Sequence, residues 1–142
     1  MTINFIKQKN CYIPKTFLQK SLPKILKHLK MQNLHIPVIK KQISLVFVSS
    51  QKMKTLNFKY RKQNKTTDIL SFQSNLGESF GDIVFDYSLV KKQADKNGHS
   101  IKQELLYLFI HGLLHLLGLD HEKSFKEEKR MYKIQDSIFN SF

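Results

Sequence analysis

The sequence predicts an α+β fold in which one small central β-sheet packs against several helices. Short segments rich in β-branched and aromatic residues lie in the middle of the 142-residue chain, whereas segments with helical periodicity lie before and after them. The length suits a single domain over residues 1–142. Hydrophobic residues make up 41% and charged residues 25%, which is typical of a globular protein with its own core.

Two strands and two helices are expected in the first half of the chain. Ile3–Ile6 has the composition of a short strand, and residues 43–48 alternate so that one face of a second strand is buried. A helix is expected after Pro14, because six apolar residues recur there at helical spacing: Phe17, Leu18, Leu22, Ile25, Leu26 and Leu29. Pro23 is expected to kink or restart this helix. Ser50–Tyr60 predicts a shorter helix that carries basic residues.

The second half is expected to begin with two more strands, Ile69–Gln73 and Asp82–Asp86, separated by a segment rich in turn residues. Ser88 is a candidate N-cap for a helix that ends near Gly98. The strands are thus clustered in the centre of the chain, and helices follow them.

The next helix carries the clearest signals. Ser100 and Gln103 form a capping-box pattern at its start. An apolar stripe then continues to Gly118, which suits the left-handed position that ends a helix and reverses the chain. The members of the stripe are Ile101, Leu105, Leu108, Phe109 and Leu116. Ser124 and Glu127 repeat the capping-box pattern and predict a last helix.

The charge of the chain is strongly asymmetric. The net charge is +13, and all eleven acidic residues lie in residues 68–142, whereas residues 1–67 hold fourteen lysines and Arg61. Lysine enrichment in an AT-rich genome does not explain why acids are absent from one half only. A one-sided positive field is typical of a protein that binds a polyanion such as nucleic acid. A solvated lysine-rich surface is the alternative.

Several features indicate a cytoplasmic protein. The single cysteine, Cys11, cannot form an intramolecular disulfide, which suits a reducing compartment. The first residues lack the uninterrupted apolar stretch of a secretory signal, and no segment approaches the ~18 consecutive apolar residues of a membrane span. We therefore expect no membrane partner.

Three histidines lie within eleven residues, at His111, His115 and His121. On a helix, positions 111 and 115 lie about 6 Å apart along the axis, so both imidazoles can bind one ion. Gly118 lets the chain turn back, which can bring His121 in as a third ligand. The sequence therefore predicts a metal site on the penultimate helix and the turn after it. Three protein ligands leave a coordination position open, as in catalytic zinc sites.

A satisfied core histidine is the alternative interpretation for any isolated histidine. The other three have no partners at ligand spacing and are interpreted as structural or surface residues: His28, His35 and His99. Asp120, beside His121, either orients a ligand histidine from outside the ligand set or caps the turn.

The same histidine spacing occurs in the zinc peptidase pattern H-E-x-x-H-x-x-G-x-x-H. Here the second position is Gly112, which cannot replace the glutamate general base of those enzymes. Such peptidases also have a methionine beneath the metal. Met131 is the candidate for it here, but this residue fits the core stripe of the last helix better. A metal site in a chain with one basic half instead points to phosphodiester cleavage, in which the ion activates water or polarises a phosphoryl oxygen.

Residues 51–67 form a candidate nucleic-acid-binding segment with six positive charges and no acid: Lys52, Lys54, Lys59, Arg61, Lys62 and Lys65. Phe58 and Tyr60 are interleaved with these charges, which suits base stacking, and burial in the core is the alternative. Arg61 is one of only two arginines, and its planar guanidinium can bind a phosphate through two hydrogen bonds, which lysine cannot do.

Three blocks of the sequence carry a family resemblance. They are Leu56–Arg61 together with Thr67–Phe72, then Gly81–Ile83, and finally Glu104–His121 with its histidines. In these blocks the chain resembles the YbeY family of bacterial rRNA maturation endoribonucleases, and its length also suits that family.

The resemblance implies a single-domain α+β metalloprotein that binds one zinc ion per chain through His111, His115 and His121. It implies a single-strand-specific endoribonuclease that acts in 16S rRNA 3′-end maturation and ribosome quality control. Arg61 and His111 are the implied catalytic residues, and Arg61 would bind or polarise the scissile phosphate opposite the metal. The implied partners are single-stranded RNA, the rRNA of the small ribosomal subunit, ribosomal proteins and an Era-type GTPase.

The chain departs from the family pattern at three positions. The family usually has proline where Thr66 and Gln73 stand, and it often has tyrosine where Leu119 stands. These changes affect loop stiffness and the wall of the site rather than the ligands.

Two other interpretations stay open at this point. One is a ribosome-assembly factor with a structural zinc and little intrinsic cleavage, which would unfold when the metal is removed. The other is a metal-dependent hydrolase of another substrate, such as a peptide or a small phosphoester. Its turnover would be insensitive to salt and to charge reversal at Lys52, Lys54 and Lys62.

Overall fold

The computed structural model describes residues 1–142 and confirms the α+β prediction. Its sheet has four strands in the order β1-β2-β4-β3, with β1, β2 and β4 parallel and β3 antiparallel at one edge. The strands are β1 (Thr2–Lys7), β2 (Gln42–Val48), β3 (Ile69–Gln73) and β4 (Ser79–Asp86). Each expected strand is present; β3 has the predicted bounds, and β1, β2 and β4 extend beyond the predicted ends.

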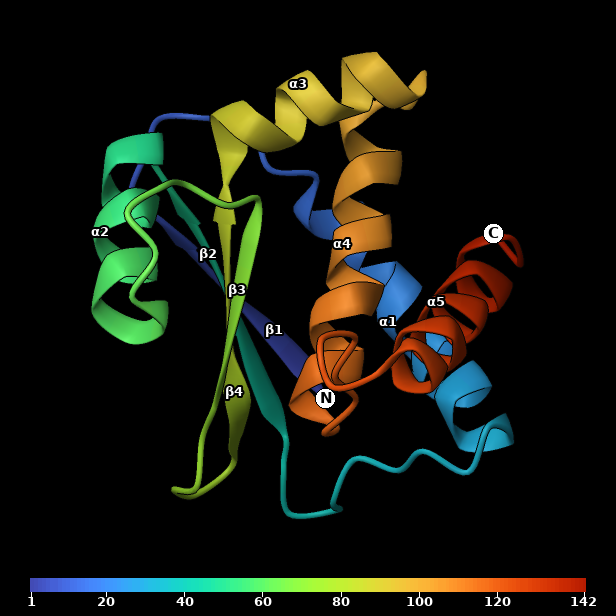
Figure 1. Ribbon diagram of the computed structural model, residues 1–142. Helices are drawn as coiled ribbons and strands as arrows, with labels where there is room; N and C mark the ends of the chain where they lie inside the picture. Colours follow the sequence, from blue (N-terminus) through green and yellow to red (C-terminus); the bar gives the residue numbers. More distant parts are fainter.

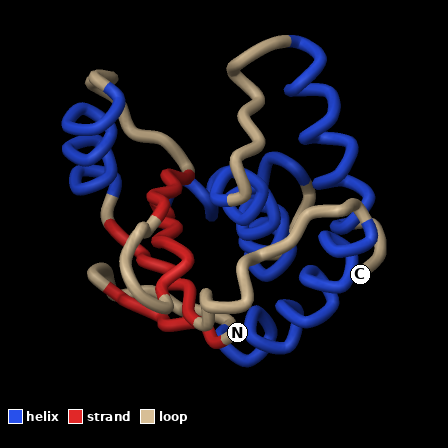
Figure 2. Tube along the Cα trace, turned by 90° about the horizontal axis from the view of Figure 1, so that it is seen from below, coloured by secondary structure: helices blue, strands red, loops and turns tan.

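Five helices surround the sheet. They are α1 (Lys15–Met31), α2 (Ser50–Arg61), α3 (Tyr87–Asn97), α4 (Ile101–Leu116) and α5 (Phe125–Phe139). The helices α1 and α4 lie on one face of the sheet with α5 packed against them, α2 lies on the opposite face, and α3 crosses above the start of α4 (Figure 1, Figure 2). No helix is both long enough and apolar enough to cross a membrane.

The alternation of residues along β2 divides the core between the two faces of the sheet. Ile43, Leu45 and Phe47 are fully buried in the main core, which α1, α4 and α5 complete. Val48 faces the other way and packs with Met53 of α2 in a smaller cluster. The predicted burial of one face of this strand is therefore confirmed, and the second face holds α2.

Helix α1 contains Pro23 without a break. The expected restart at this proline is wrong, because one helix continues through it. The buried apolar residues of α1 lie on both sides of the proline and pack into one core: Leu18, Leu22, Ile25 and Leu29. This burial offsets the cost of a proline inside a helix, which is about 3 kcal/mol.

Side chains cap the helix starts. Ser100 Oγ accepts from the backbone N–H of Gln103, and Gln103 Oε1 accepts from that of Ser100, which confirms the capping box of α4. At α3 the expected cap is wrong, because Asp86 and not Ser88 accepts from the backbone N–H of Leu89, at 3.2 Å. The helix follows β4 without a loop, so the last residue of the strand occupies the N-cap position.

The end of α3 and the start of α5 lie where the sequence predicts them. Helix α3 ends at Gly98, whose φ of 67° is left-handed. At the start of α5, Ser124 Oγ accepts from the backbone N–H of Glu127 at 3.2 Å. The reciprocal bond of a full capping box is not made there, so that prediction is only half confirmed.

Gly112 lets α4 lie directly against the sheet. A Cβ atom at this position would lie 2.7 Å from Cδ1 and 3.0 Å from Cγ2 of Ile83, closer than van der Waals contact allows. Ile83 is a fully buried residue of β4, so its side chain cannot move away without disturbing the close-packed core. The glycine therefore sets the distance between α4 and the strand beneath it.

Replacing this glycine with alanine should destabilise the protein, although alanine is the better helix former by about 1 kcal/mol. We expect Gly112→Ala to lower the free energy of unfolding in urea by about 1–3 kcal/mol, because the added methyl group overpacks the core. The measurement is made with a chelator present, which removes any contribution from metal binding.

The same substitution in an Ile83→Val protein tests whether contact with Ile83 causes the loss of stability. Ile83→Val removes the nearest clashing atom, so Gly112→Ala should cost less stability in an Ile83→Val protein than in the wild type. An alanine variant that is more stable than the wild type would contradict the close approach of helix and sheet.

Candidate metal centre and nucleic-acid cavity

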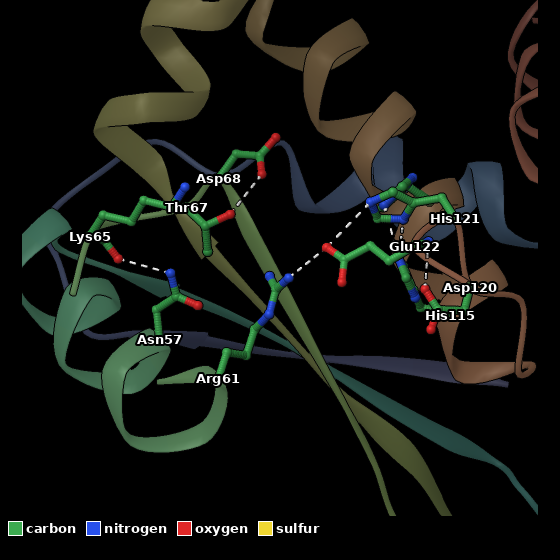
Figure 3. Close-up of polar contacts among 10 residues, drawn as sticks. Asn57, Arg61, Lys65, Thr67, Asp68, His115, Asp120, His121 and Glu122 are labelled. Atoms are coloured by element: carbon green, nitrogen blue, oxygen red, sulfur yellow. Dashed lines mark hydrogen bonds and ion pairs between the residues drawn. The ribbon is translucent and has the colours of Figure 1, made fainter. Parts of the chain in front are cut away.

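Three histidine side chains converge where α4 ends. His111 and His115 lie one turn apart on α4, and Gly118, with a φ of 94°, turns the chain so that His121 comes back toward them. Nε2 of His115 lies 3.2 Å from Nε2 of His111. It also lies 3.2 Å from Nδ1 of His121 (Figure 3). The candidate ligand atoms of all three lie within 4.8 Å of one another.

This spacing fits one tetrahedral metal ion. With Zn–N bonds of about 2.0–2.1 Å, two nitrogens of a tetrahedral site lie about 3.3 Å apart. The two shorter nitrogen–nitrogen distances of the cluster, 3.2 Å each, are close to that value. The three histidines can therefore hold one metal ion and leave a fourth position open.

Gln135 of α5 fixes the orientation of His111. Its Nε2 donates to the carbonyl oxygen of Tyr107 at 3.3 Å, which leaves Oε1 to accept from Nδ1 of His111 at 2.9 Å. With the proton on Nδ1, the lone pair of His111 lies on Nε2, the atom that faces the other histidines. Gln135 is completely buried, and nothing local in the sequence indicates that a helical glutamine contacts a histidine of another helix.

Burial keeps two of these histidines in the neutral form. It lowers the pKa of His111, although the hydrogen bond to Gln135 acts in the opposite direction. The pKa of His115 is lowered to about 4, first by burial and then by the neighbouring His111 and His121. A neutral imidazole is the form that binds a metal, so both side chains are ready to do so at neutral pH.

Arg61 lies at the C-terminal end of α2 and reaches toward the histidines. Its Nη2 donates to Oε1 of Glu122 at 2.8 Å, and the same oxygen lies 3.8 Å from Nε2 of His121 (Figure 3). The side chains of the pair remain exposed, 34% for Arg61 and 59% for Glu122, so solvent screens their attraction. Another anion can therefore compete for Arg61. Glu122 is not among the residues that the sequence predicts for the site, although it directly follows a candidate ligand.

One cavity of about 990 Å³ connects these groups. Its lining includes the three clustered histidines, Arg61 and Lys65, and also Lys123, which is not among the predicted residues. The other basic residues predicted to bind RNA lie outside the lining and are exposed: Lys52, Lys54, Lys59 and Lys62. The basic segment is thus divided between the cavity and the surface on and after α2.

Hydrogen bonds with two buried side chains, Asn57 and Asp86, hold the loop that carries Lys65. Asn57 Nδ2 donates to the carbonyl oxygen of Lys65 at 2.9 Å (Figure 3). Thr66 Oγ1 donates to Oδ2 of Asp86 at 2.6 Å, and Ser50 Oγ donates to Oδ1 of the same buried carboxylate at 2.9 Å. The hydroxyl of Thr66 therefore restrains the loop at a position where the YbeY pattern usually has proline.

The other two departures from that pattern also have structural partners. Gln73 Nε2 donates to the carbonyl oxygen of Leu116 at 3.2 Å and ties the end of β3 to the end of α4. Leu119 is buried in the main core. None of the three departures replaces a candidate ligand.

The structure gives structural roles to three residues that the sequence analysis considered near the metal site: Asp120, Met131 and Gly112. Asp120 Oδ1 accepts from the backbone N–H of Glu122 at 2.8 Å, which is a turn-capping interaction rather than a bond to a ligand histidine. Met131 is completely buried in the core, as the stripe of α5 predicts. At Gly112 the nearby Ile83 leaves no room for the glutamate of the peptidase pattern.

The other aromatic residues and histidines that the sequence singles out lie on or near the surface. Phe58 and Tyr60 are each 55% exposed, so their burial in the core, the alternative considered above, is wrong. His35 is exposed and His28 is half-buried. His99 forms a hydrogen bond of 2.9 Å with a carboxylate of α4.

Known proteins are similar to this chain in sequence and in fold. A family model described as Endoribonuclease YbeY matches residues 3–142. The Endoribonuclease YbeY of Persephonella marina is 36% identical over 135 residues, which cover 91% of this chain and 84% of that protein. The Endoribonuclease YbeY of Mycoplasmopsis synoviae is 49% identical over 112 residues, which cover 72% of each. A solution structure of a Thermotoga maritima protein is 26% identical with a TM-score of 0.62, and the match covers 97% of this chain and 87% of that one.

Removing the hydrogen-bond acceptor of Gln135 should weaken metal binding. Gln135→Met keeps the length of the side chain but lacks the amide, and we expect it to lower the affinity for Zn²⁺ by about 10–100-fold. Gln135→Glu keeps an acceptor for His111, although it loses the donor to Tyr107 and adds a carboxylate, so its affinity should stay closer to that of the wild type than the affinity of Gln135→Met does. Competition with a chromophoric zinc chelator measures both variants, and circular dichroism checks their folds. Equal affinity of the wild type and Gln135→Met would show that His111 does not need this contact.

Proposed function

The chain belongs to the YbeY family, and from this premise we propose that it is a metal-dependent endoribonuclease that cuts single-stranded RNA. We assign it one catalytic domain over residues 1–142 and one Zn²⁺ per chain, held by His111, His115 and His121. Its proposed task is rRNA processing in the cytoplasm, namely 16S rRNA 3′-end maturation and ribosome quality control. Its proposed partners are the rRNA of the small subunit, ribosomal proteins and an Era-type GTPase.

The observation that best supports this function is the position of an anionic oxygen between Arg61 and the histidines. Oε1 of Glu122 lies 2.8 Å from Nη2 of Arg61 and 3.8 Å from Nε2 of His121. A phosphate oxygen also carries negative charge and accepts the same hydrogen bonds, so a scissile phosphate can take this position when Glu122 moves away. The backbone of an RNA strand would then lie beside the candidate metal ligands.

Arg61 binds the scissile phosphate in this proposal. Its guanidinium offers N–H groups in one plane and can donate two hydrogen bonds to the phosphate, which fixes the orientation of the phosphodiester. The same charge stabilises the negative charge that accumulates on the phosphate oxygens in the transition state. A divalent metal held by the histidines would supply Lewis acidity at this phosphate and lower the pKa of water there.

The basic residues on and after α2 attract the RNA in this proposal. Lys65 lines the cavity. The exposed basic residues outside it are Lys52, Lys54, Lys59 and Lys62. Contacts of this kind neutralise phosphates without reading the sequence, so RNA binding should weaken steeply as salt rises. Phe58, exposed among these lysines, offers an aromatic face for base stacking.

Cleavage should depend on His111 and on Arg61. We expect the zinc-loaded wild type to cut a labelled single-stranded RNA, and His111→Ala, purified identically, to lose this activity because the metal loses a ligand. Arg61→Ala should slow cleavage by about 100–1,000-fold, the effect of removing a donor that stabilises a developing oxyanion. Denaturing gel electrophoresis of the products measures the rates.

The second arginine of the chain provides the control. Arg130 is exposed on α5 outside the cavity lining, so Arg130→Ala should cut at the wild-type rate. Equal cutting by the wild type and His111→Ala would identify a contaminating ribonuclease. No cutting by either would favour an assembly factor with a structural zinc, and turnover of only a peptide or a small phosphoester would favour another hydrolase.

Removing the charge of Glu122 should strengthen RNA binding. We expect Glu122→Gln to lower the Kd for a fluorescent single-stranded RNA by up to about fivefold, because Arg61 no longer has to leave an exposed ion pair worth about 1 kcal/mol. The measurement is made in EDTA, which prevents cleavage. Glu78→Gln changes the net charge equally outside the cavity and should have a smaller effect. If Glu122→Gln binds no more tightly than Glu78→Gln, the carboxylate does not compete with RNA.

A further inference from the structure

One stripe of α4 faces the cavity along most of the helix. Its members that line the cavity are Glu104, Tyr107, Leu108, His111 and His115. Each of them lies three or four residues from another member, which places them on one side of the helix. Glu104 lies seven residues before His111, which is about 10 Å along the helix axis. The cavity therefore extends about two helical turns beyond the candidate metal centre, toward the junction of α3 and α4 (Figure 1).

Glu104 is a buried carboxylate at this far end of the cavity, and only 2% of it is exposed. Its Oε2 accepts from Nδ1 of His99 at 2.9 Å and from Nδ2 of Asn97 at 3.5 Å, which fixes the carboxylate in place. Its Oε1 has no partner in the protein. Among the side-chain polar atoms that solvent cannot reach, only Oδ1 of Asn57 lacks a hydrogen-bond partner. Oε1 of Glu104 also lacks a partner, so solvent can reach it, and the cavity that Glu104 lines provides this access.

The surroundings of this oxygen suit a base rather than a phosphate. The neutral amides of Gln93 and Asn97 on α3 line the same end of the cavity. The side chain of Leu108 adds apolar surface. A buried carboxylate needs hydrogen-bond donors and repels phosphate, so the ligand of this region must offer N–H or O–H groups.

We propose that this end of the cavity is a nucleobase subsite in which Oε1 of Glu104 accepts a hydrogen bond from the exocyclic amino group of a base adjacent to the scissile phosphate. The proposal rests on the proposed RNA function. Adenine, cytosine and guanine carry such an amino group, and pairing of a glutamate with the cytosine amino group is a known mode of base recognition. Uracil carries none, and its single base N–H, at N3, lies between two carbonyl oxygens that the carboxylate repels. The subsite therefore discriminates against uracil.

The test compares the wild type with Glu104→Gln and uses Glu78→Gln as the control. Glu78 pairs with Lys41 at the surface and loses the same charge outside the cavity. Zinc-loaded protein is titrated with AMP, CMP or UMP, and displacement of a fluorescent single-stranded DNA oligonucleotide reports binding. We expect the wild type and Glu78→Gln to bind AMP and CMP at least about tenfold more tightly than UMP. Glu104→Gln should bind all three within about threefold, because its amide both donates and accepts hydrogen bonds.

A second ligand keeps the test independent of the folding of any variant. The N6,N6-dimethyl derivative of AMP lacks the amino N–H groups, so the wild type should bind it as weakly as UMP. Equal binding of AMP and this derivative would overturn the subsite.

Failure of the subsite can be distinguished from failure of the nuclease proposal. Discrimination against UMP that persists in a folded Glu104→Gln protein would overturn the role of this carboxylate, whatever the rate of RNA cleavage. Base-selective nucleotide binding by a wild type that does not cut RNA would support the subsite and overturn the nuclease proposal.

Discussion

The close contact between α4 and β4 is the constraint on which the site depends. With Gly112 against Ile83, one face of α4 lies on the sheet and the adjacent face, from Glu104 to His115, lines the cavity. A larger side chain at position 112 would push the helix away or rotate it, and both faces would then move together. Gly112, which stands where the peptidase pattern has its glutamate, is therefore also the residue that allows α4 to pack against the sheet.

Segments far apart in the sequence complete the environment of that helix. The end of α2 brings Arg61, the turn after α4 brings His121 and Glu122, and α5 brings Gln135. The orientation of the candidate ligands thus depends on how α5 packs, whereas the anion position depends on how α2 packs. Because these helices lie on opposite faces of the sheet, the sheet itself sets the distance between the candidate metal ligands and Arg61 (Figure 1).

The features that the sequence predicts well are those encoded by neighbouring residues. The capping box of α4 and the left-handed Gly118 depend on residues close in the chain, and so does the spacing that brings His111 and His115 together. Burial of one face of β2 follows in the same way from alternation.

Features that depend on tertiary contacts were not predictable. Asp86 caps α3 in place of Ser88 because β4 runs directly into the helix, and the same carboxylate also accepts from Ser50 and Thr66 on distant segments. Pro23 is tolerated because both halves of α1 pack into the same core. The partner of His111 on α5 likewise depends on how two helices pack, which no local pattern encodes.

In the proposed function, one set of residues attracts RNA to the protein and another set positions it for cleavage. The exposed lysines on and after α2 act over about 8 Å at physiological ionic strength and do not select a sequence. The cavity is different, because its lining carries four acids beside its basic residues: Asp68, Glu104, Asp120 and Glu122. A polyanion is therefore not held throughout the cavity by charge, and a phosphate is favoured beside its basic residues, above all where Arg61 lies near the candidate metal ligands. Elsewhere the acids favour groups that donate hydrogen bonds, so a strongly basic protein can attract any RNA and still position one phosphodiester.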